Sequence, residues 1–365
     1  MMQTRPEADA AGAVVLREMA ATDADLALFR ACFGNNGNPP RSAEALRWQY
    51  LQNVTGELFV DLALADDGRR VAAIYATLPG FMRIDGQKRR VLQSLDTLTD
   101  AAFRGKGLFV SLAQKTFVRA AASGMALVYG FPNANSAHGF FKKLAWTSLD
   151  PVPFLIRPLR TRYFAERMPK KLRAAAAMLP DVRLPAVAVP LPRGARVIDV
   201  DAWDERVTDL WNAFARGVGV SVERDARYLQ WRLGDKPNEH YRTIALENNG
   251  RYDALCTYTT KIKHGGRIGY VMELLHCNGQ RRAAAGLLAR AVRAMAEDGA
   301  DAALAWCFRH SPNYLPHVAN GFVPMPERLR PIELHMGVRA FDPALARILG
   351  ERSQWYVSYL DSDTV

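Results

Sequence analysis

The feature that most constrains this chain is a glycine-rich turn, Arg-Gly-Lys-Gly-Leu-Phe at 104–109, which joins a strand-like run to a helix-like run. The run before the turn, 91–99, reads Val-Leu-Gln-Ser-Leu-Asp-Thr-Leu-Thr. After the turn, apolar residues recur at 108/109, 112/113, 116/117 and 120/121, which is the spacing of one helix face. Gly124 then provides a helix stop. The pattern predicts a strand, a tight turn and a helix over 107–123.

A glycine-rich turn that leads into a helix N-terminus forms a site for anions. Unpaired backbone N–H groups and the positive end of the helix dipole converge there, and small residues let a phosphate approach. Arg104 and Lys106 add positive charge. The spacing fits neither standard nucleotide motif, because the dinucleotide fingerprint needs a glycine where Val110 stands, and a Walker-type loop needs Ser or Thr where Gly107 stands.

The segments that follow add to this pattern. Residues 125–131, Met-Ala-Leu-Val-Tyr-Gly-Phe, form a short apolar run of the buried-strand type. A turn cluster at 132–136 and a helix-like segment at 137–144 come next, closed by Ala145 and Trp146. Strand, turn, helix, strand, turn and helix thus succeed one another between 91 and 146.

With these segments the chain resembles the GNAT family of N-acetyltransferases over roughly residues 13–150. The family's central motif, Arg/Gln-x-x-Gly-x-Gly/Ala, falls on 104–109, and its second motif, Asn…Phe-Tyr-x-Lys-Leu-Gly-Phe, falls on Phe-Phe-Lys-Lys-Leu-Ala-Trp at 140–146. The resemblance implies that the strands at 89–99 and 125–131 run parallel and splay apart. The pantetheine arm of an acyl-CoA occupies that gap in the family.

The second half of the chain resembles a distant copy of the first, at an offset near 180 residues. Leu-Arg-Trp-Gln-Tyr at 46–50 corresponds to Leu-Gln-Trp-Arg-Leu at 229–233, and Leu95-Asp96 corresponds to Met272-Glu273. The glycine turn survives only in the first half, because its counterpart at 279–286 keeps two arginines and loses the tight glycine pair. We therefore expect a degenerate second lobe that braces the first and forms a wall of the acceptor site.

The expected fold class is α+β, with two tandem GNAT-like lobes, each a mixed, mostly antiparallel sheet flanked by helices. The expected domains are an acyl-CoA-binding domain at 13–156, a basic linker at 157–195, a second lobe at 196–345 and a C-terminal tail at 346–365. In the first lobe we expect strands at 14–19, 58–65, 70–79 and 89–99, and helices at 22–32, capped by Thr22 and Asp25, and at 42–53.

Composition and charge narrow the class of protein. A chain of 365 residues is long enough for two domains, and no stretch has transmembrane length or a signal-peptide pattern, so we expect a cytoplasmic location. The net charge is +11, and residues 157–183 carry eight basic side chains against two acidic ones. We interpret 157–183 as a solvated linker with a short helix at 170–178. The alternative is a basic segment in peripheral contact with an anionic membrane at the inner face.

The resemblance places the co-substrate, acetyl-CoA or another short acyl-CoA, on the first lobe. Its pantetheine and thioester are expected against the backbone of Thr97, Leu98 and Thr99, with an N–H of 95–99 polarising the thioester carbonyl. Asn133 and Ser136 lie where the second motif touches CoA, although turn formation and helix capping explain them equally well. The diphosphate is expected on Arg104, Gly105, Lys106, Gly107, Leu108 and Phe109.

Asp96 is the first candidate for the general base, because it is a carboxylate in an otherwise apolar strand, where burial raises a pKa toward a useful value. The alternative is an Asp that only orients the amine, or one satisfied by the hydroxyls of Thr97 or Thr99. His138 is the second titrating candidate. The family's usual acid, a tyrosine, falls on Phe141, which cannot donate a proton, so Tyr129, Ser136, His138 or water must replace it, or the thiolate leaves unassisted.

The sequence therefore predicts an acyl-CoA-dependent N-acyltransferase, most simply an N-acetyltransferase, whose acceptor is a primary amine such as an amino sugar of a surface glycan precursor. Trp48, Tyr50, Tyr228 and Trp231 either line a large acceptor cleft or pack in the core. The alternatives are a Fem-type transferase that uses aminoacyl-tRNA, or a non-catalytic basic binding module. We expect no nucleic-acid partner and no metal, since the set of His276, Cys277, Cys307 and His310 lacks finger-type spacing.

Overall fold

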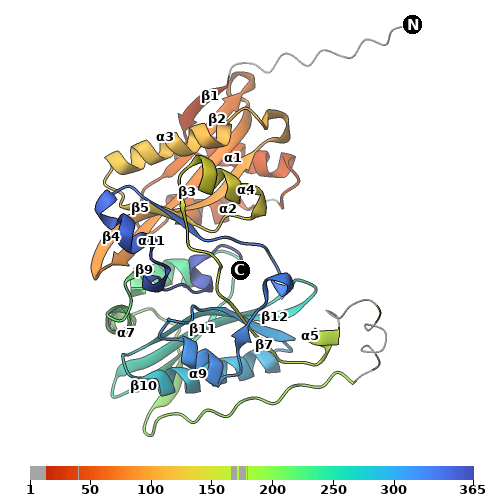
Figure 1. Ribbon diagram of the computed structural model, residues 1–365, viewed down its shortest axis with the longest axis vertical. Helices are drawn as coiled ribbons and strands as arrows, with labels where there is room; N and C mark the ends of the chain where they lie inside the picture. Colours follow the sequence, from red (N-terminus) through yellow and green to blue (C-terminus); the bar gives the residue numbers. More distant parts are fainter. Residues whose placement is uncertain (1–13, 40, 166–170, 172–177, 179) are drawn as a thin grey trace.

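The computed structural model describes residues 14–39, 41–165, 171, 178 and 180–365. Two sheets lie one above the other along the long axis of the molecule, with the N-terminal half above and the second half below (Figure 1). Each sheet is mostly antiparallel and flanked by helices, as the sequence predicted. The helix expected at 170–178 falls largely outside the described residues.

The first sheet has the order β1-β2-β3-β4-β5-β15-β6, with β9 paired to β3. All of its pairs are antiparallel except β4 with β5. The strands expected at 70–79 and 89–99 extend to a hairpin that turns at Asp85-Gly86. The strands are β1 (Val15–Glu18), β2 (Phe59–Ala65), β3 (Arg70–Ile84), β4 (Gln87–Thr99), β5 (Leu127–Gly130), β6 (Thr147–Ser148), β9 (Val220–Val222) and β15 (Gly337–Ala340).

The second sheet has the order β14-β7-β13-β12-β11-β10-β8. Its one parallel pair is β12 with β13, which repeats the β4–β5 pair of the first sheet. The strands are β7 (Phe154–Pro158), β8 (Arg196–Asp199), β10 (Arg242–Asn248), β11 (Arg251–Lys263), β12 (Gly266–His276), β13 (Ala302–Trp306) and β14 (Val323–Pro324).

Helices flank the two sheets (Figure 1). In the first half they are α1 (Asp23–Asn35), α2 (Ala43–Leu46), α3 (Leu108–Ala122), α4 (Ala134–His138) and α5 (Arg162–Ala165). In the second half they are α7 (Glu205–Ala215), α8 (Ala226–Leu229), α9 (Arg281–Glu297), α10 (Tyr314–Ala319) and α11 (Ala346–Gly350). Single π-helical turns continue α2, α4 and α8, namely η1 (Arg47–Leu51), η4 (Gly139–Lys143) and η5 (Gln230–Gly234). Short 3₁₀ turns are η2 (Asp66–Gly68), η3 (Ala101–Phe103), η6 (Glu327–Leu329), η7 (Pro343–Leu345), η8 (Arg352–Gln354) and η9 (Tyr359–Asp361).

Two details of the first helices differ from the sequence prediction. Thr22 caps α1 by accepting from the backbone N–H of Asp25, as expected. Asp25 does not reciprocate, because its carboxylate accepts from the N–H of Ala20 and pairs with Arg17 at 2.6 Å. The single helix expected at 42–53 is a short α-helix that widens into the π-turn η1.

The two lobes exchange strands. β7 follows the first lobe in sequence and pairs with β13 and β14 in the second sheet, whereas β15 follows the second lobe and pairs with β5 and β6 in the first sheet. The expected boundary at 156 thus falls inside β7. The C-terminal segment expected at 346–365 packs into the core, where Trp355, Tyr359 and Leu360 are buried between the sheets.

A pair of tryptophans relates the two halves at the lobe junction. The rings of Trp48 and Trp231 stack with their centroids 4.8 Å apart. The Nε1 of Trp48 donates to the carbonyl of Trp231 at 2.9 Å, and the Nε1 of Trp231 donates to the carbonyl of Trp48 at 3.2 Å. The reciprocal contact, between residues 183 apart in matching π-turns, is the geometry of a tandem repeat. Of the two interpretations of these aromatic positions, core packing is confirmed.

Candidate active site

The first sheet opens where the sequence predicted a gap. β4 and β5 pair in parallel at 92–94 with 128–130; β5 then ends, whereas β4 continues to Thr99. Gly130 stands at the point of divergence, and a Cβ there would lie 2.8 Å from the carbonyl oxygen of Ser94. Only glycine allows this approach. In the described part of the chain no strand pairs with the β5-facing edge of 95–99, which is therefore open to a ligand.

A pocket of about 950 Å³ occupies this fork, and most of the predicted site residues line it. Leu95, Phe131 and Trp146 contribute its apolar walls. The Oγ1 of Thr97 and the Nε1 of Trp146 are buried without a hydrogen-bond partner in the described structure, and both residues line the pocket. The predicted residues in the lining are Asp96, Thr97, Leu98, Thr99, Arg104, Phe109, Asn133, Ser136 and His138.

The remaining predicted residues form the turn beside the pocket. Gly105 and Gly107 adopt left-handed backbone angles, with φ of +79° and +76°, which side chains other than glycine rarely tolerate. Gly107 is the N-cap of α3 and supplies no capping side chain, so the first-turn N–H groups of α3 have no side-chain acceptor. Arg104, Gly105, Lys106 and Gly107 are exposed, and Leu108 is half-buried. The structure thus has the exposed glycine turn at a helix start that the spacing predicted, and anion binding there stays a prediction.

The bulky residue at the end of the turn, Phe109, points into the core. The ring of Phe109 packs edge-on against Phe140, with centroids 5.1 Å apart, and tilts against Tyr75. Space for it comes from Gly139, where a Cβ would lie 2.6 Å from Phe109 Cε1. Sequence reasoning missed this contact between Phe109 and Gly139, because the two residues lie on different helical segments.

Asn133 and Ser136 line the pocket and also cap a helix. The side-chain oxygen of Asn133 accepts from the N–H groups of Asn135 and Ser136, at 3.1 and 3.2 Å, which makes Asn133 the N-cap of α4. The hydroxyl of Ser136 is 3.3 Å from the carbonyl of Asn133. Capping, one of the two interpretations, is therefore confirmed, and a ligand contact stays a prediction for both residues.

Asp96 sits at an irregularity in β4. Its φ is +46°, and the register between β3 and β4 shifts beside it, which turns its side chain into the fork. One carboxylate oxygen, Oδ2, accepts from Tyr50 at 2.7 Å, from Gln49 at 3.2 Å and from the guanidinium of Arg41. The carboxylate is therefore clamped through a single oxygen.

The surroundings of Asp96 raise its pKa, which is the direction that a general base requires. Burial raises its pKa, the charge of Arg41 opposes the rise, and the charge of Asp363 adds to it. The hydroxyls of Thr97 and Thr99 are not its partners, because the hydrogen bonds to Asp96 from the described residues come from Arg41, Gln49 and Tyr50. Sequence reasoning missed Arg41 and Gln49, which lie about 50 residues away along the chain and follow no motif.

The positions of the candidate residues limit which of them can protonate the leaving thiolate. Phe141 packs on β15, where a Cβ at Gly337 would lie 2.7 Å from its Cε1, and it does not line the pocket. Tyr129 is buried at the lobe junction beside Trp355, with ring centroids 6.4 Å apart, and also lies outside the lining. His138, which is exposed, and Ser136 both line the pocket.

The corresponding fork of the second lobe is filled. β12 and β13 pair as far as Val271 and Ala305, and beyond that point the amide of Asn313 donates to the carbonyl of Leu274 at 2.6 Å. Glu273, the counterpart of Asp96, is fully buried and pairs with Arg224 at 2.7 Å. Arg224 in turn binds Asp361 of the C-terminal segment at 2.6 Å. Protein groups thus occupy the space that stays open in the first lobe.

Within the described residues, no three His, Cys, Asp or Glu side chains are placed to hold a metal ion. The four cysteines are free, and burial raises the pKa of Cys32 and Cys307 to about 12. No described helix combines the length and the apolar character that crossing a bilayer requires.

Comparison with known proteins agrees with this geometry. Residues 17–148 match the sequence model of the acetyltransferase (GNAT) domain, and no curated protein sequence matches the chain. The Saccharomyces cerevisiae N-myristoyltransferase with bound myristoyl-CoA has a similar fold, with a TM-score of 0.59 at 11% identity, over 92% of this chain and 86% of that one.

Two bacterial structures are similar over nearly the same share of this chain. A GCN5-related N-acetyltransferase from Anabaena variabilis has a TM-score of 0.61 at 11% identity, over 90% of this chain and 73% of that one. A conserved protein of unknown function from Enterococcus faecalis, described as a probable N-acyltransferase, has a TM-score of 0.61 at 13% identity, over 90% and 72% of the two chains. Residues 17–148 are therefore a GNAT acetyltransferase domain, and the chain is a two-lobe acyltransferase of the GNAT fold.

Proposed function

We propose that this acyltransferase moves a short acyl group, most simply acetyl, from an acyl-CoA to a primary amine. The observation that carries the proposal is the open β4–β5 fork with the uncapped, glycine-paired start of α3 beside it. An extended polar chain can pair with the free edge of 95–99, while a diphosphate binds the exposed turn at 104–107. The orphan groups of Thr97 and Trp146 fit a ligand that carries amides.

The residues of the fork have distinct roles in the proposed reaction. Backbone N–H groups of 95–99 that no strand binds polarise the thioester carbonyl. Asp96, held through Oδ2, takes a proton from the acceptor ammonium, and the resulting amine attacks the thioester carbon. The C–N bond forms as the C–S bond breaks, and the thiolate leaves either unassisted or with a proton from water, His138 or Ser136.

The acceptor class that we propose is an amino sugar of a surface glycan precursor. Its support is the surplus of positive charge, +11 over the chain, which favours an acceptor on an anionic carrier. The stacked tryptophans of the lobe junction no longer support it, since they are core residues.

Cytoplasmic location and peripheral membrane contact through 157–183 are part of the same proposal. Three arginines of this segment are engaged within the protein: Arg157 is buried in β7, Arg160 pairs with Asp181 at 2.6 Å, and Arg162 pairs with Asp301 at 2.5 Å. Co-sedimentation with vesicles of anionic or neutral lipid at physiological salt tests the contact, and equal binding to both would contradict an electrostatic one.

The reaction is tested by turnover. Purified protein is incubated with acetyl-, butyryl- or myristoyl-CoA and a panel of amines that includes glucosamine, spermidine and a glycyl peptide, and the free thiol of CoA is measured. We expect amine-dependent release of CoA, faster with acetyl-CoA than with myristoyl-CoA. A thermal shift with tRNA and none with any acyl-CoA would instead support the Fem-type alternative.

A further inference from the structure

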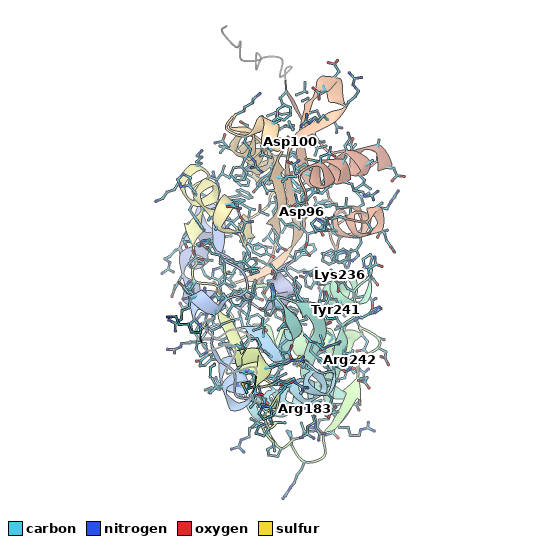
Figure 2. The ribbon with its side chains drawn as sticks, turned by 90° about the vertical axis from the view of Figure 1, so that its right-hand side faces the viewer. Asp96, Asp100, Arg183, Lys236, Tyr241 and Arg242 are labelled. Atoms are coloured by element: carbon cyan, nitrogen blue, oxygen red, sulfur yellow. The ribbon has the colours of Figure 1, made fainter. Side chains whose placement is uncertain are left out.

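We infer that the acceptor amine binds between two carboxylates, Asp96 of β4 and Asp363 of the C-terminal segment, at the junction of the lobes. The inference rests on the proposed acyl transfer and adds to it the second carboxylate and the segment that carries it. Figure 2 shows Asp96 in the upper lobe, with Lys236 and Tyr241 of the lower lobe just beneath it in that view.

The first carboxylate, Asp96, is bound through only one of its two oxygens among the described residues. All three donors that reach Asp96, from Arg41, Gln49 and Tyr50, bind Oδ2. No hydrogen bond from the described residues reaches Oδ1, and Asp96 lines the pocket of the fork. The clamp therefore fixes the carboxylate and leaves Oδ1 free to accept from an ammonium group.

The second carboxylate is held in place by its backbone. Arg232 donates to the carbonyls of Leu360 and Ser362, at 3.3 and 2.6 Å, and Lys263 donates to that of Thr364. These bonds fix the chain on both sides of Asp363. Its carboxylate makes only long ion pairs, 3.7 Å to Arg232 Nη1 and 4.0 Å to Lys236 Nζ, and its side chain is 33% exposed.

Two contacts bring the carboxylates to the same place. Gln93, three residues before Asp96 on β4, donates to the carbonyl of Asp361 at 2.7 Å. The ring of Trp48 lies 5.9 Å from both Arg232 and Lys236, the cations nearest Asp363. The next two residues after Trp48 are Gln49 and Tyr50, which hold Asp96. The π-turn η1 thus holds Asp96 and also contacts the two cations nearest Asp363.

The charges agree with this placement. The ionisable groups that face Asp96 are Arg41, Tyr50 and Asp363, and the negative charge of Asp363 raises the pKa of Asp96. Arg41 pairs with Asp96, and the cations nearest Asp363 are Arg232 and Lys236, at 3.7 and 4.0 Å. A bound ammonium donates to the free Oδ1 of Asp96, and its proton moves to that oxygen as the N–H bond breaks. The substrate class is an amine that enters in its protonated form.

The variant that tests the inference is Asp363→Asn, with Asp363→Glu as rescue and Glu351→Gln, an exposed residue of the same segment, as control. The titration of Asp96 is followed by carbon NMR of protein labelled at aspartate carboxyl groups, with Asp96→Asn to assign the signal. Removing a like charge lowers a carboxyl pKa. We therefore expect the titration midpoint of Asp96 to move to lower pH in Asp363→Asn, and to stay in the other two variants.

Binding of n-butylammonium, in the presence of acetyl-CoA, is the second readout. We expect its Kd to rise at least about fivefold in Asp363→Asn, and to stay within about twofold of wild type in Asp363→Glu and Glu351→Gln. An unchanged midpoint for Asp96, or unchanged butylammonium binding, overturns the inference. Calorimetry with acetyl-CoA on the same samples separates the two failures, because wild-type protein that binds no acetyl-CoA contradicts the proposed function itself.

Discussion

In the first lobe β5 stops pairing with β4 at Gly130, and a pocket of about 950 Å³ follows; in the second lobe β13 stops pairing with β12 at Ala305, and side chains follow. The same fork therefore serves two purposes. An open fork leaves a strand edge for a ligand, whereas a fork closed by Asn313, Arg224 and Glu273 stabilises the protein. The two lobes therefore differ in their forks: the β5-facing strand edge at 95–99 of the first lobe has no protein partner among the described residues, whereas protein groups fill the fork of the second lobe.

The sharpest test of the comparison is the pair Asp96→Asn and Glu273→Gln, at corresponding positions of the two forks. We expect Asp96→Asn to lower kcat/KM by about 10²–10⁴-fold, because a general base contributes that much. In wild type, activity should fall as the pH drops through the raised pKa of Asp96, and this acidic limb should disappear in Asp96→Asn. Kinetics over pH 5–9 provides the measurement.

Glu273→Gln should behave in the opposite way, with lower stability and retained acetyl-CoA affinity. If Glu273→Gln abolished turnover in a folded protein, while Asp96→Asn did not, the roles assigned to the two lobes would be reversed.

The second prediction concerns the arginines that bind these acids. Arg224 is fully buried, and Arg224→Met leaves Glu273 and Asp361 buried without their cation. We expect the free energy of unfolding to fall by about 3–5 kcal/mol. Arg41→Met should cost about 1 kcal/mol or less, because Asp96 keeps Tyr50 and Gln49 and reaches the pocket. Urea unfolding measures both variants, and equal losses of unfolding free energy in Arg224→Met and Arg41→Met would contradict this prediction.

Acid should weaken the filled fork. His317, on α10, is fully buried, and burial lowers its pKa to about 4. In the unfolded chain the pKa of this histidine is near 6.5, so it binds a proton at a higher pH than in the folded protein. The free energy of unfolding therefore falls as the pH drops from about 6.5 toward 4. Wild type should lose up to about 3 kcal/mol more than His317→Gln between pH 7 and pH 4. Parallel loss in the two proteins would show that the pKa of His317 is the same in the folded and the unfolded state.

The smallest expected effect comes from the packing under the glycine turn. In Gly139→Ala the new methyl would lie 2.6 Å from Phe109 Cε1, so one of the two must shift, at a cost of about 1–3 kcal/mol. Phe109→Leu in the same chain should recover part of that loss. Thermal unfolding of the two single variants and the double variant measures the coupling, and strictly additive losses would contradict the contact.

Sequence reasoning predicted what local patterns encode. The turn at 104–107 and the helix after it follow from glycine placement and apolar spacing, the diverging strands follow from the family resemblance, and each is found in the structure. Asp96 was identified because a carboxylate stands out in an apolar strand. The repeat was visible because Trp48 and Trp231 recur in matching surroundings.

The rest depends on contacts between distant residues. Arg41 reaches Asp96 across 55 positions, and Gln93 reaches Asp361 across 268. The exchange of β7 and β15 between the sheets leaves no periodic signal, because the two strands are only five and four residues long. The C-terminal segment gave no motif, although its aromatic residues fill the lobe junction.

The most direct test of the account is calorimetry of acetyl-CoA binding to wild type, Gly107→Val and Gly124→Val. The two glycines lie at opposite ends of α3, with nearly equal φ of +76° and +78° and nothing within 4 Å of an added Cβ, so both variants carry similar backbone strain. The account predicts that Gly124→Val binds acetyl-CoA as wild type does, and that Gly107→Val, folded by circular dichroism, loses affinity by at least about 100-fold. Normal binding by Gly107→Val would contradict the assignment of the diphosphate to this turn.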